Sequence, residues 1–283
     1  MIQATLLAVD SRDFIYAYFP DSGLFISKNN GNDWQSMTSG LKEISAMTVL
    51  SDDKIILGGS DQYIYVSKDL GSTWESTKYT EIASITSTIY ETYDNKIIIG
   101  STTGTYLTDS TFNAWDSANV GLNNSIAVDI IENDTKQLLN ATNNQGLFLF
   151  NETQQEWEKN NWGLTSNFLT VLEKDSHGVL YIGTYDNGVF RSTDGGTNWN
   201  IIKNGLPSHI ISLAINKDDH VFAGTDNGVF RLPEGSYTWK SLNNELDFKV
   251  IRDLIVNSNG YIFIATDGGI YSSSSSTHLG EQR

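Results

Sequence analysis

Short apolar runs recur along the whole chain, and each is bounded by small or polar residues that favour turns. The runs are "FIYAY", "KIILG", "KIIIG", "QLLNA", "LYIGT", "HVFAG" and "YIFIA". Each precedes a turn-like cluster such as "TDNGVF" and follows a β-rich run such as "FLTVL" or "IISLAI". Apolar runs of this length between turn residues predict β-strands. Because helical spacing is not sustained anywhere, the pattern predicts an all-β fold.

The tryptophans give these strands a period. Successive members of the series lie 40 to 42 residues apart, at Trp34, Trp74, Trp115, Trp157, Trp199 and Trp239. A seventh position falls near Leu279, and only Trp162 lies outside the series. Each unit contains four predicted strands, named A to D in chain order, and strand D begins at the tryptophan. Four-stranded units of roughly 40 residues predict a β-propeller, because a single sheet buries its two apolar faces only when stacked between neighbours in a ring.

Seven such units fill the chain, so we expect one seven-bladed propeller of antiparallel four-stranded blades over residues 1–283. The expected blades cover residues 2–40, 41–80, 81–121, 122–163, 164–204, 205–245 and 246–283. After "GIYSS" the last unit continues as "SSSTHLGEQR", which has no tryptophan and little β-propensity. We therefore expect a weak or missing outer strand in the seventh blade.

A turn motif recurs between strands C and D. It reads "SKDLGSTW" at 67–74, "STDGGTNW" at 192–199 and "SKNNGNDW" at 27–34, and decays in the other units. Asp side chains accept hydrogen bonds from their own turns, and Gly permits a positive φ, so the repetition favours a structural role over a catalytic one. The residues expected to fold these turns are Ser67, Asp69, Gly71, Thr73, Trp74, Ser192, Asp194, Gly196, Trp199 and Trp34.

The pattern S-x-D-x-G-x-T-W resembles the Asp-box, or bacterial neuraminidase, repeat. "SKDLGSTW" matches every specified position, whereas the other copies depart at Asn198 and at Asn29 and Asp33. Propellers with this repeat include sialidases, xyloglucanases, sortilin-like receptors and photosystem II stability/assembly factor-like proteins. The segment 205–231 is also similar to propeller repeats in sensor regions of hybrid two-component regulators. The resemblance implies that the boxes lie at the periphery, away from any ligand.

Charge and composition narrow the classes of partner. The chain has 18 basic and 34 acidic residues and a net charge of −16, which argues against nucleic acid and anionic lipid as partners. It has no cysteine, which excludes disulfides and thiolate chemistry. No apolar run is long enough to span a bilayer, and the first residues show no export signal. The acidic, Asn/Ser/Thr-rich repeat and the family resemblance favour a bacterial periplasmic or cell-surface location and a monomeric domain.

No catalytic residue, metal ligand or cofactor is predicted. A sialidase would need three converging arginines, but of the five arginines only Arg252 lies in an inner strand. The four histidines lack metal-ligand spacing. A glycan hydrolase would need two carboxylates about 5–9.5 Å apart, and the sequence brings no particular pair together. The favoured function is a non-catalytic ligand-sensing or protein/glycan interaction module. The alternative is a glycan-active enzyme, or one propeller of a larger one.

Propellers bind ligands at the mouth of the central channel, where D–A and B–C loops meet. Aromatic side chains beside Asp and Asn in these loops suit a glycan, peptide or protein ligand. The candidate binding residues are Phe19, Trp162, Phe168, Tyr185, Asp186, His209, Asp226, Phe248 and Arg252. Asp129, Arg252 and Asp253 lie in inner strands, where unpaired burial is costly. We expect these charges to face the channel or to pair with one another.

Overall fold

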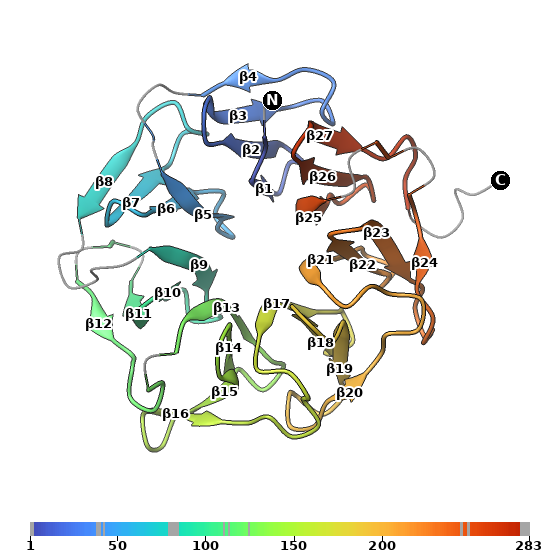
Figure 1. The fold of residues 1–283 in the computed structure, drawn as a ribbon. Helices are drawn as coiled ribbons and strands as arrows, with labels where there is room; N and C mark the ends of the chain where they lie inside the picture. Colours follow the sequence, from blue (N-terminus) through green and yellow to red (C-terminus); the bar gives the residue numbers. More distant parts are fainter. Residues whose placement is uncertain are drawn as a thin grey trace.

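The computed structural model confirms the seven-bladed propeller (Figure 1). It describes residues 3–37, 41, 43–78, 85–109, 111–112, 114–123, 125–243, 246–247 and 250–277. Seven antiparallel sheets surround a central axis, and each sheet is built from consecutive strands. Blades 1 to 6 have four strands, and blade 7 has three within the described part of the chain.

Strands A and B of each blade lie nearest the axis. The A strands are β1 (Leu6–Val9), β5 (Ile44–Val49), β9 (Thr86–Glu91), β13 (Ala127–Glu132), β17 (Leu169–Lys174), β21 (Ile210–Ile215) and β25 (Ile251–Val256). The B strands are β2 (Ile15–Phe19), β6 (Ile55–Gly59), β10 (Ile97–Ser101), β14 (Leu138–Thr142), β18 (Leu180–Thr184), β22 (Val221–Thr225) and β26 (Ile262–Thr266). The B strands β6, β10, β18, β22 and β26 are buried at every residue, since a neighbouring blade covers each face.

Strands C and D form the outer half of each blade. The C strands are β3 (Gly23–Ser27), β7 (Tyr63–Ser67), β11 (Gly104–Thr108), β15 (Gly146–Asn151), β19 (Val189–Ser192), β23 (Gly228–Leu232) and β27 (Gly269–Ser272). The D strands are β4 (Gln35–Ser36), β8 (Glu75–Lys78), β12 (Asp116–Ser117), β16 (Glu156–Lys159), β20 (Asn200–Ile201) and β24 (Lys240–Ser241). Most D strands are only two residues long, so the packing of the adjacent tryptophan, more than strand pairing, holds the periphery.

Small residues let the blades converge on the axis. A Cβ atom added at Gly183 would lie 2.6 Å from Val171 in its own blade and 2.7 Å from Ile210 in the next. These separations are too short for real carbon atoms, so any larger residue at this position of β18 would force the blades apart. The inner strands also carry a register shift near this level in every blade except the first.

Blade 7 closes the ring against blade 1. The Leu7 amide of β1 donates to the Asp253 carboxylate of β25 at 2.7 Å. On the face formed by the A–B turns, the Ser258 amide and hydroxyl donate to Asp13 at 2.8 and 2.7 Å. Trp34 of blade 1 packs in one apolar cluster with Phe263 of β26. The first and last blades are therefore joined at the axis, at the turns and at the periphery.

The box turns fold through their own side chains. The Ser67 hydroxyl accepts the Gly71 amide at 2.7 Å, and the Asp69 carboxylate accepts the amide and hydroxyl of Thr73 at 2.8 and 2.7 Å. The hydrogen bond from the Thr73 amide lowers the pKa of Asp69. Trp199 is 3% exposed and packs with Leu139 of the preceding blade, so the boxes also join neighbouring blades.

The seventh position of the tryptophan series, expected near Leu279, lies outside the described residues. Ser192 pairs with the first residue of β18 and precedes Trp199 by seven residues. Its counterpart Ser273 follows β27 and donates its amide to the first residue of β26, Ile262. Seven residues after Ser273 stands Gly280, which lies outside the described residues together with Leu279.

Candidate functional site

A cavity of about 650 Å³ opens between blades 4 and 5 at the face formed by the B–C loops. It contains three of the candidate binding residues, Phe168, Tyr185 and Asp186. The other lining residues are Val128, Asn143, Leu169 and Thr170. Phe168 precedes β17, and Tyr185 follows β18, so the ends of two paired strands place the two residues beside the same cavity. The Tyr185 amide donates to the Phe168 carbonyl at 2.9 Å and fixes this arrangement.

The cavity presents apolar rings together with a polar group that lacks a protein partner. Phe168 is 51% exposed and Tyr185 is 58% exposed, which is unusual for side chains of this size. The Thr170 hydroxyl is buried and has no hydrogen-bond partner among the described residues. A ligand hydroxyl or amide could satisfy it while a ring of the ligand packs on the aromatic side chains.

Two further candidate residues extend this surface onto blade 6. The Tyr185 and His209 rings lie 4.3 Å apart between centroids. His209 Nδ1 lies 3.6 Å from the Asp226 carboxylate, which comes from the β22–β23 loop. Phe168, Tyr185, Asp186, His209 and Asp226 therefore form one continuous surface, called the aromatic face below. It combines stacking groups with carboxylates able to accept hydrogen bonds.

The remaining candidates lie apart from the aromatic face. Phe19 is half-buried and packs edge-to-face on Phe25 at 5.3 Å in blade 1. Arg252 pairs with Asp267 at 2.9 Å in blade 7. Trp162 is 74% exposed in the loop before β17 but does not line the cavity. Phe248 lies outside the described residues.

The charges of the inner strands tie blades together. Asp129 accepts the Leu172 amide of the next blade at 2.8 Å and the Thr88 hydroxyl of the previous blade at 3.2 Å. Asp253 accepts the Leu7 amide in the same way. Arg252 and Asp253 do not pair with each other, because successive residues of a strand point in different directions and Arg252 reaches Asp267 instead.

Burial raises the pKa of three carboxyl groups in the inner strands. It raises the pKa of Asp129 to about 6 and that of Asp253 to about 7. Burial, followed by the charges of Asp129 and Asp253, raises the pKa of Glu173 in β17 to about 8. Glu173 was not among the sequence candidates, although its place in the A strand "FLTVLEK" was a signal available there. Of the three carboxyls, only that of Glu173 has a pKa above neutral pH.

A second acidic group lies at the opposite face, among the A–B turns. Ligand atoms of Asp175, His177 and Asp219 lie within 4.8 Å of one another. The Asp175 carboxylate already accepts the Val179 amide at 2.9 Å, and Asp219 accepts the Ser176 hydroxyl at 2.7 Å. These protein donors account for the geometry as a latch between blades 5 and 6, so we assign no ion to it. Sequence spacing missed the group because it spans two blades.

Comparison with known proteins shows which solved structures share this fold. No family model and no curated protein matches the chain. The extracellular domain of the putative hybrid two component system BT4673 from B. thetaiotaomicron matches with a TM-score of 0.80 and 20% identity, over 96% of this chain and 38% of that one. This chain thus spans less than half the length of that domain.

This chain covers nearly the full length of two other solved structures. YCF48 bound to D1 peptide matches with a TM-score of 0.75 and 14% identity, over 96% of this chain and 92% of that one. A catalytically inactive virginiamycin B lyase from Staphylococcus aureus with quinupristin matches with a TM-score of 0.80 and 12% identity, over 96% and 94%. At these identities the likeness defines the class as a seven-bladed β-propeller. Among the described residues, no helix has the length and apolar character needed to cross a membrane.

Proposed function

We propose that the protein is a non-catalytic Asp-box propeller that binds a glycan or peptide ligand on its aromatic face. The observation that carries this proposal is the cavity of about 650 Å³ between blades 4 and 5, with two exposed rings and an unpartnered buried hydroxyl. Aromatic faces supply contact area, and Asp186 and Asp226 supply acceptors for hydroxyl or amide donors. The hydrogen bonds of the box turns support membership of the Asp-box family.

A sensing role at the bacterial periplasm or cell surface accords with the structural neighbours. The BT4673 domain is extracellular and belongs to a putative two component system. YCF48 is bound to a peptide, which is a second ligand class carried by this fold. The net charge of −16 favours neutral or cationic ligands over nucleic acid.

A glycan and peptide array, followed by titration calorimetry on each positive, tests the proposal. We expect Tyr185→Ala and Phe168→Ala to weaken binding by about tenfold or more, since each removes a stacking group. Tyr237→Ala is the matched control, because Tyr237 is 62% exposed but lies at the periphery of blade 6. Wild-type affinity in both cavity variants would remove the aromatic face from the binding site.

A glycan-active enzyme is the second candidate, and the raised pKa of Glu173 favours it. A general acid works best when its pKa lies near the operating pH, and the pKa of Glu173 is about 8. Incubation of each glycan found on the array with the protein, followed by mass spectrometry, tests this function. Cleavage that is lost in Glu173→Gln would establish the enzyme. Glycans that remain intact would favour the non-catalytic binding module instead.

A further inference from the structure

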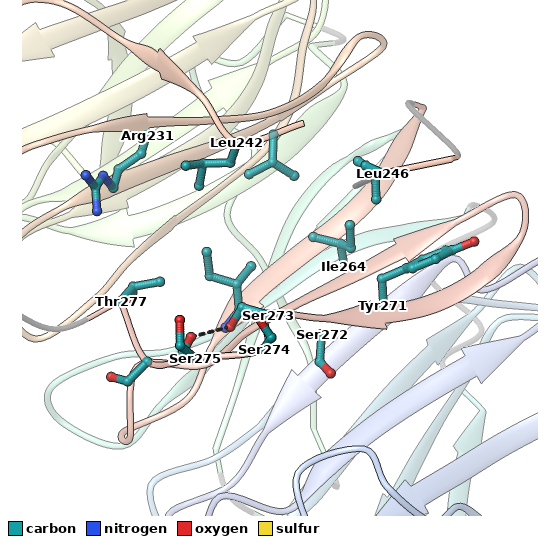
Figure 2. Close-up of a pocket in the computed structure, with 13 residues that line it drawn as sticks. Arg231, Leu242, Leu246, Ile264, Tyr271, Ser272, Ser273, Ser274, Ser275 and Thr277 are labelled. Carbon is teal, nitrogen blue, oxygen red and sulfur yellow. Dashed lines mark hydrogen bonds between the residues drawn. The ribbon is translucent and has the colours of Figure 1, made fainter. Parts of the chain in front are cut away.

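A slot between blades 6 and 7 lies at the periphery and shares no lining residue with the cavity of the aromatic face. It has a volume of about 590 Å³ and is lined by Val229, Leu242 and Leu246 on one side and by Ile262, Ile264 and Tyr271 on the other. Figure 2 shows Arg231 and Leu242 facing Ile264 and Tyr271 across the slot. The polar residues Ser272–Thr277 complete the lining. The slot is therefore an opening between two apolar walls, with one cationic side chain and a run of hydroxyl side chains beside it.

The equivalent position between blades 5 and 6 is filled by a tryptophan. Trp239 is 3% exposed and packs with Val189 and Ile202 of blade 5 and Phe230 of its own blade. In the repeat register Val229, Leu242 and Tyr271 are the counterparts of these three residues.

The difference in exposure shows what the slot lacks. Ile202, beneath Trp239, is 4% exposed, whereas its counterpart Leu242 is 40% exposed. Val229 and Phe230 of β23 are buried, whereas Ile270 and Tyr271 of β27 are half-buried. Among the described residues, blade 7 has neither an outer strand nor a tryptophan.

Polar groups at the slot also fit a tryptophan side chain like the one between blades 5 and 6. The Trp239 indole donates to the Ile202 carbonyl at 2.7 Å, and the Trp157 indole donates to the Ala118 carbonyl at 2.7 Å. The Leu242 carbonyl occupies the equivalent place in the repeat. Arg231 Nε is buried without a hydrogen-bond partner among the described residues. A carboxylate or carbonyl of an entering segment would supply that partner.

We propose that this slot binds an extended segment of a partner protein that carries a tryptophan near an acidic residue. The segment adds a fourth strand beside β27, and its indole packs between Leu242 and Tyr271, as the tryptophans of the other blades do. Main-chain pairing supplies the alignment, and the indole and Arg231 contacts supply selectivity. The proposal is independent of the function assigned to the aromatic face.

A peptide with the sequence of one of this chain's own box segments can serve as the probe for this slot. A fluorescein-labelled peptide with the sequence of residues 67–78, "SKDLGSTWESTK", carries a complete box and an outer strand. We expect fluorescence anisotropy to show saturable binding, weakened about tenfold or more when Trp74 of the peptide is replaced by Ala, because a buried indole contributes a large apolar area. Hydrogen exchange should show added protection of β27 with the Trp peptide.

Variants of the protein test the place of binding. Leu242→Lys should weaken peptide binding about tenfold, since a charge would enter the slot. Ile201→Lys is the matched control, because Ile201 is also 40% exposed but lies on blade 5. Circular dichroism of both variants checks that they are folded.

With the full chain, three outcomes would overturn the proposal. They are equal binding of the Trp and Ala peptides, undiminished binding to folded Leu242→Lys, and protection outside β27. A further experiment repeats the peptide titration with a chain that ends at Thr277. Peptide binding by that shorter chain alone would make residues 278–283, and not a partner protein, the occupant of the slot.

Discussion

Residues that depart from the Asp-box pattern still form the side-chain hydrogen bond between the third and seventh positions of the turn. In the complete copy, the Thr73 hydroxyl donates to Asp69 at 2.7 Å. In blade 5 the Asn198 amide takes that role and donates to Asp194 at 2.7 Å. In blade 1 the roles are reversed, because the Asn29 amide donates to Asp33 at 2.8 Å. The sequence departures are therefore alternative ways to close the same turn.

This equivalence gives a prediction for blade 5. Ser192 is 1% exposed and its hydroxyl accepts the Gly196 amide at 3.0 Å. Ser192→Ala leaves that buried amide unpaired, so we expect the free energy of unfolding to fall by about 1–3 kcal/mol in urea titrations. Asn198→Thr is the control and should change it by less than about 0.5 kcal/mol, since a hydroxyl replaces the amide donor. An unchanged midpoint for Ser192→Ala would contradict a structural role for the box.

At the scale of strands, the chain's pattern was sufficient for the fold and insufficient for the site. Apolar runs such as "KIIIG" predict buried strands because both faces of a B strand are covered, whatever the neighbour. The meeting of Phe168 with Tyr185 depends on the pairing of β17 with β18, and Phe19 turns onto Phe25 although its loop is of the same kind. Such contacts depend on the angles between strands and blades, which no local pattern encodes.

The inner strands also predict how stability depends on pH. The pKa values of Asp129, Asp253 and Glu173 are raised in the folded state, to about 6, 7 and 8. A raised carboxyl pKa stabilises the fold below the unfolded pKa, and this stabilisation is lost as pH rises through the folded pKa. We therefore expect the melting temperature to decrease from pH 5 to about pH 8, with each group contributing at most about 1.4 kcal/mol per pH unit.

Glu173→Gln should flatten this decrease up to about pH 8, most distinctly between pH 7 and pH 8, because the amide stays neutral throughout. Glu75→Gln is the control, since the Glu75 side chain is 73% exposed in an outer strand. Melting curves at single-unit pH steps provide the measurement. A wild-type melting temperature that does not vary over this range, or an unaltered slope in Glu173→Gln, would contradict a half-buried Glu173 with a raised pKa.

At the scale of the whole molecule, the ring is closed firmly at its axis and weakly at one edge. The Leu7–Asp253 and Ser258–Asp13 hydrogen bonds join blades 7 and 1, so the junction of the chain's two ends is not the open point. The opening lies on the other side of blade 7, where β27 pairs only with β26 among the described residues. The outer strand of blade 7, expected to be weak or missing, is thus absent among the described residues.

Hydrogen exchange of the free protein tests this asymmetry. We expect the amides of β27 to exchange about tenfold faster or more than those of β23, because β23 lies between two strands and beneath Trp239. The amides of β26 should stay as protected as those of β22, since blade 1 packs against β26 through Trp34. Fast exchange in both β26 and β27 would mean that the whole blade opens. Equal protection of β27 and β23 would mean that the edge is covered in solution, and either result would contradict local opening at β27 alone.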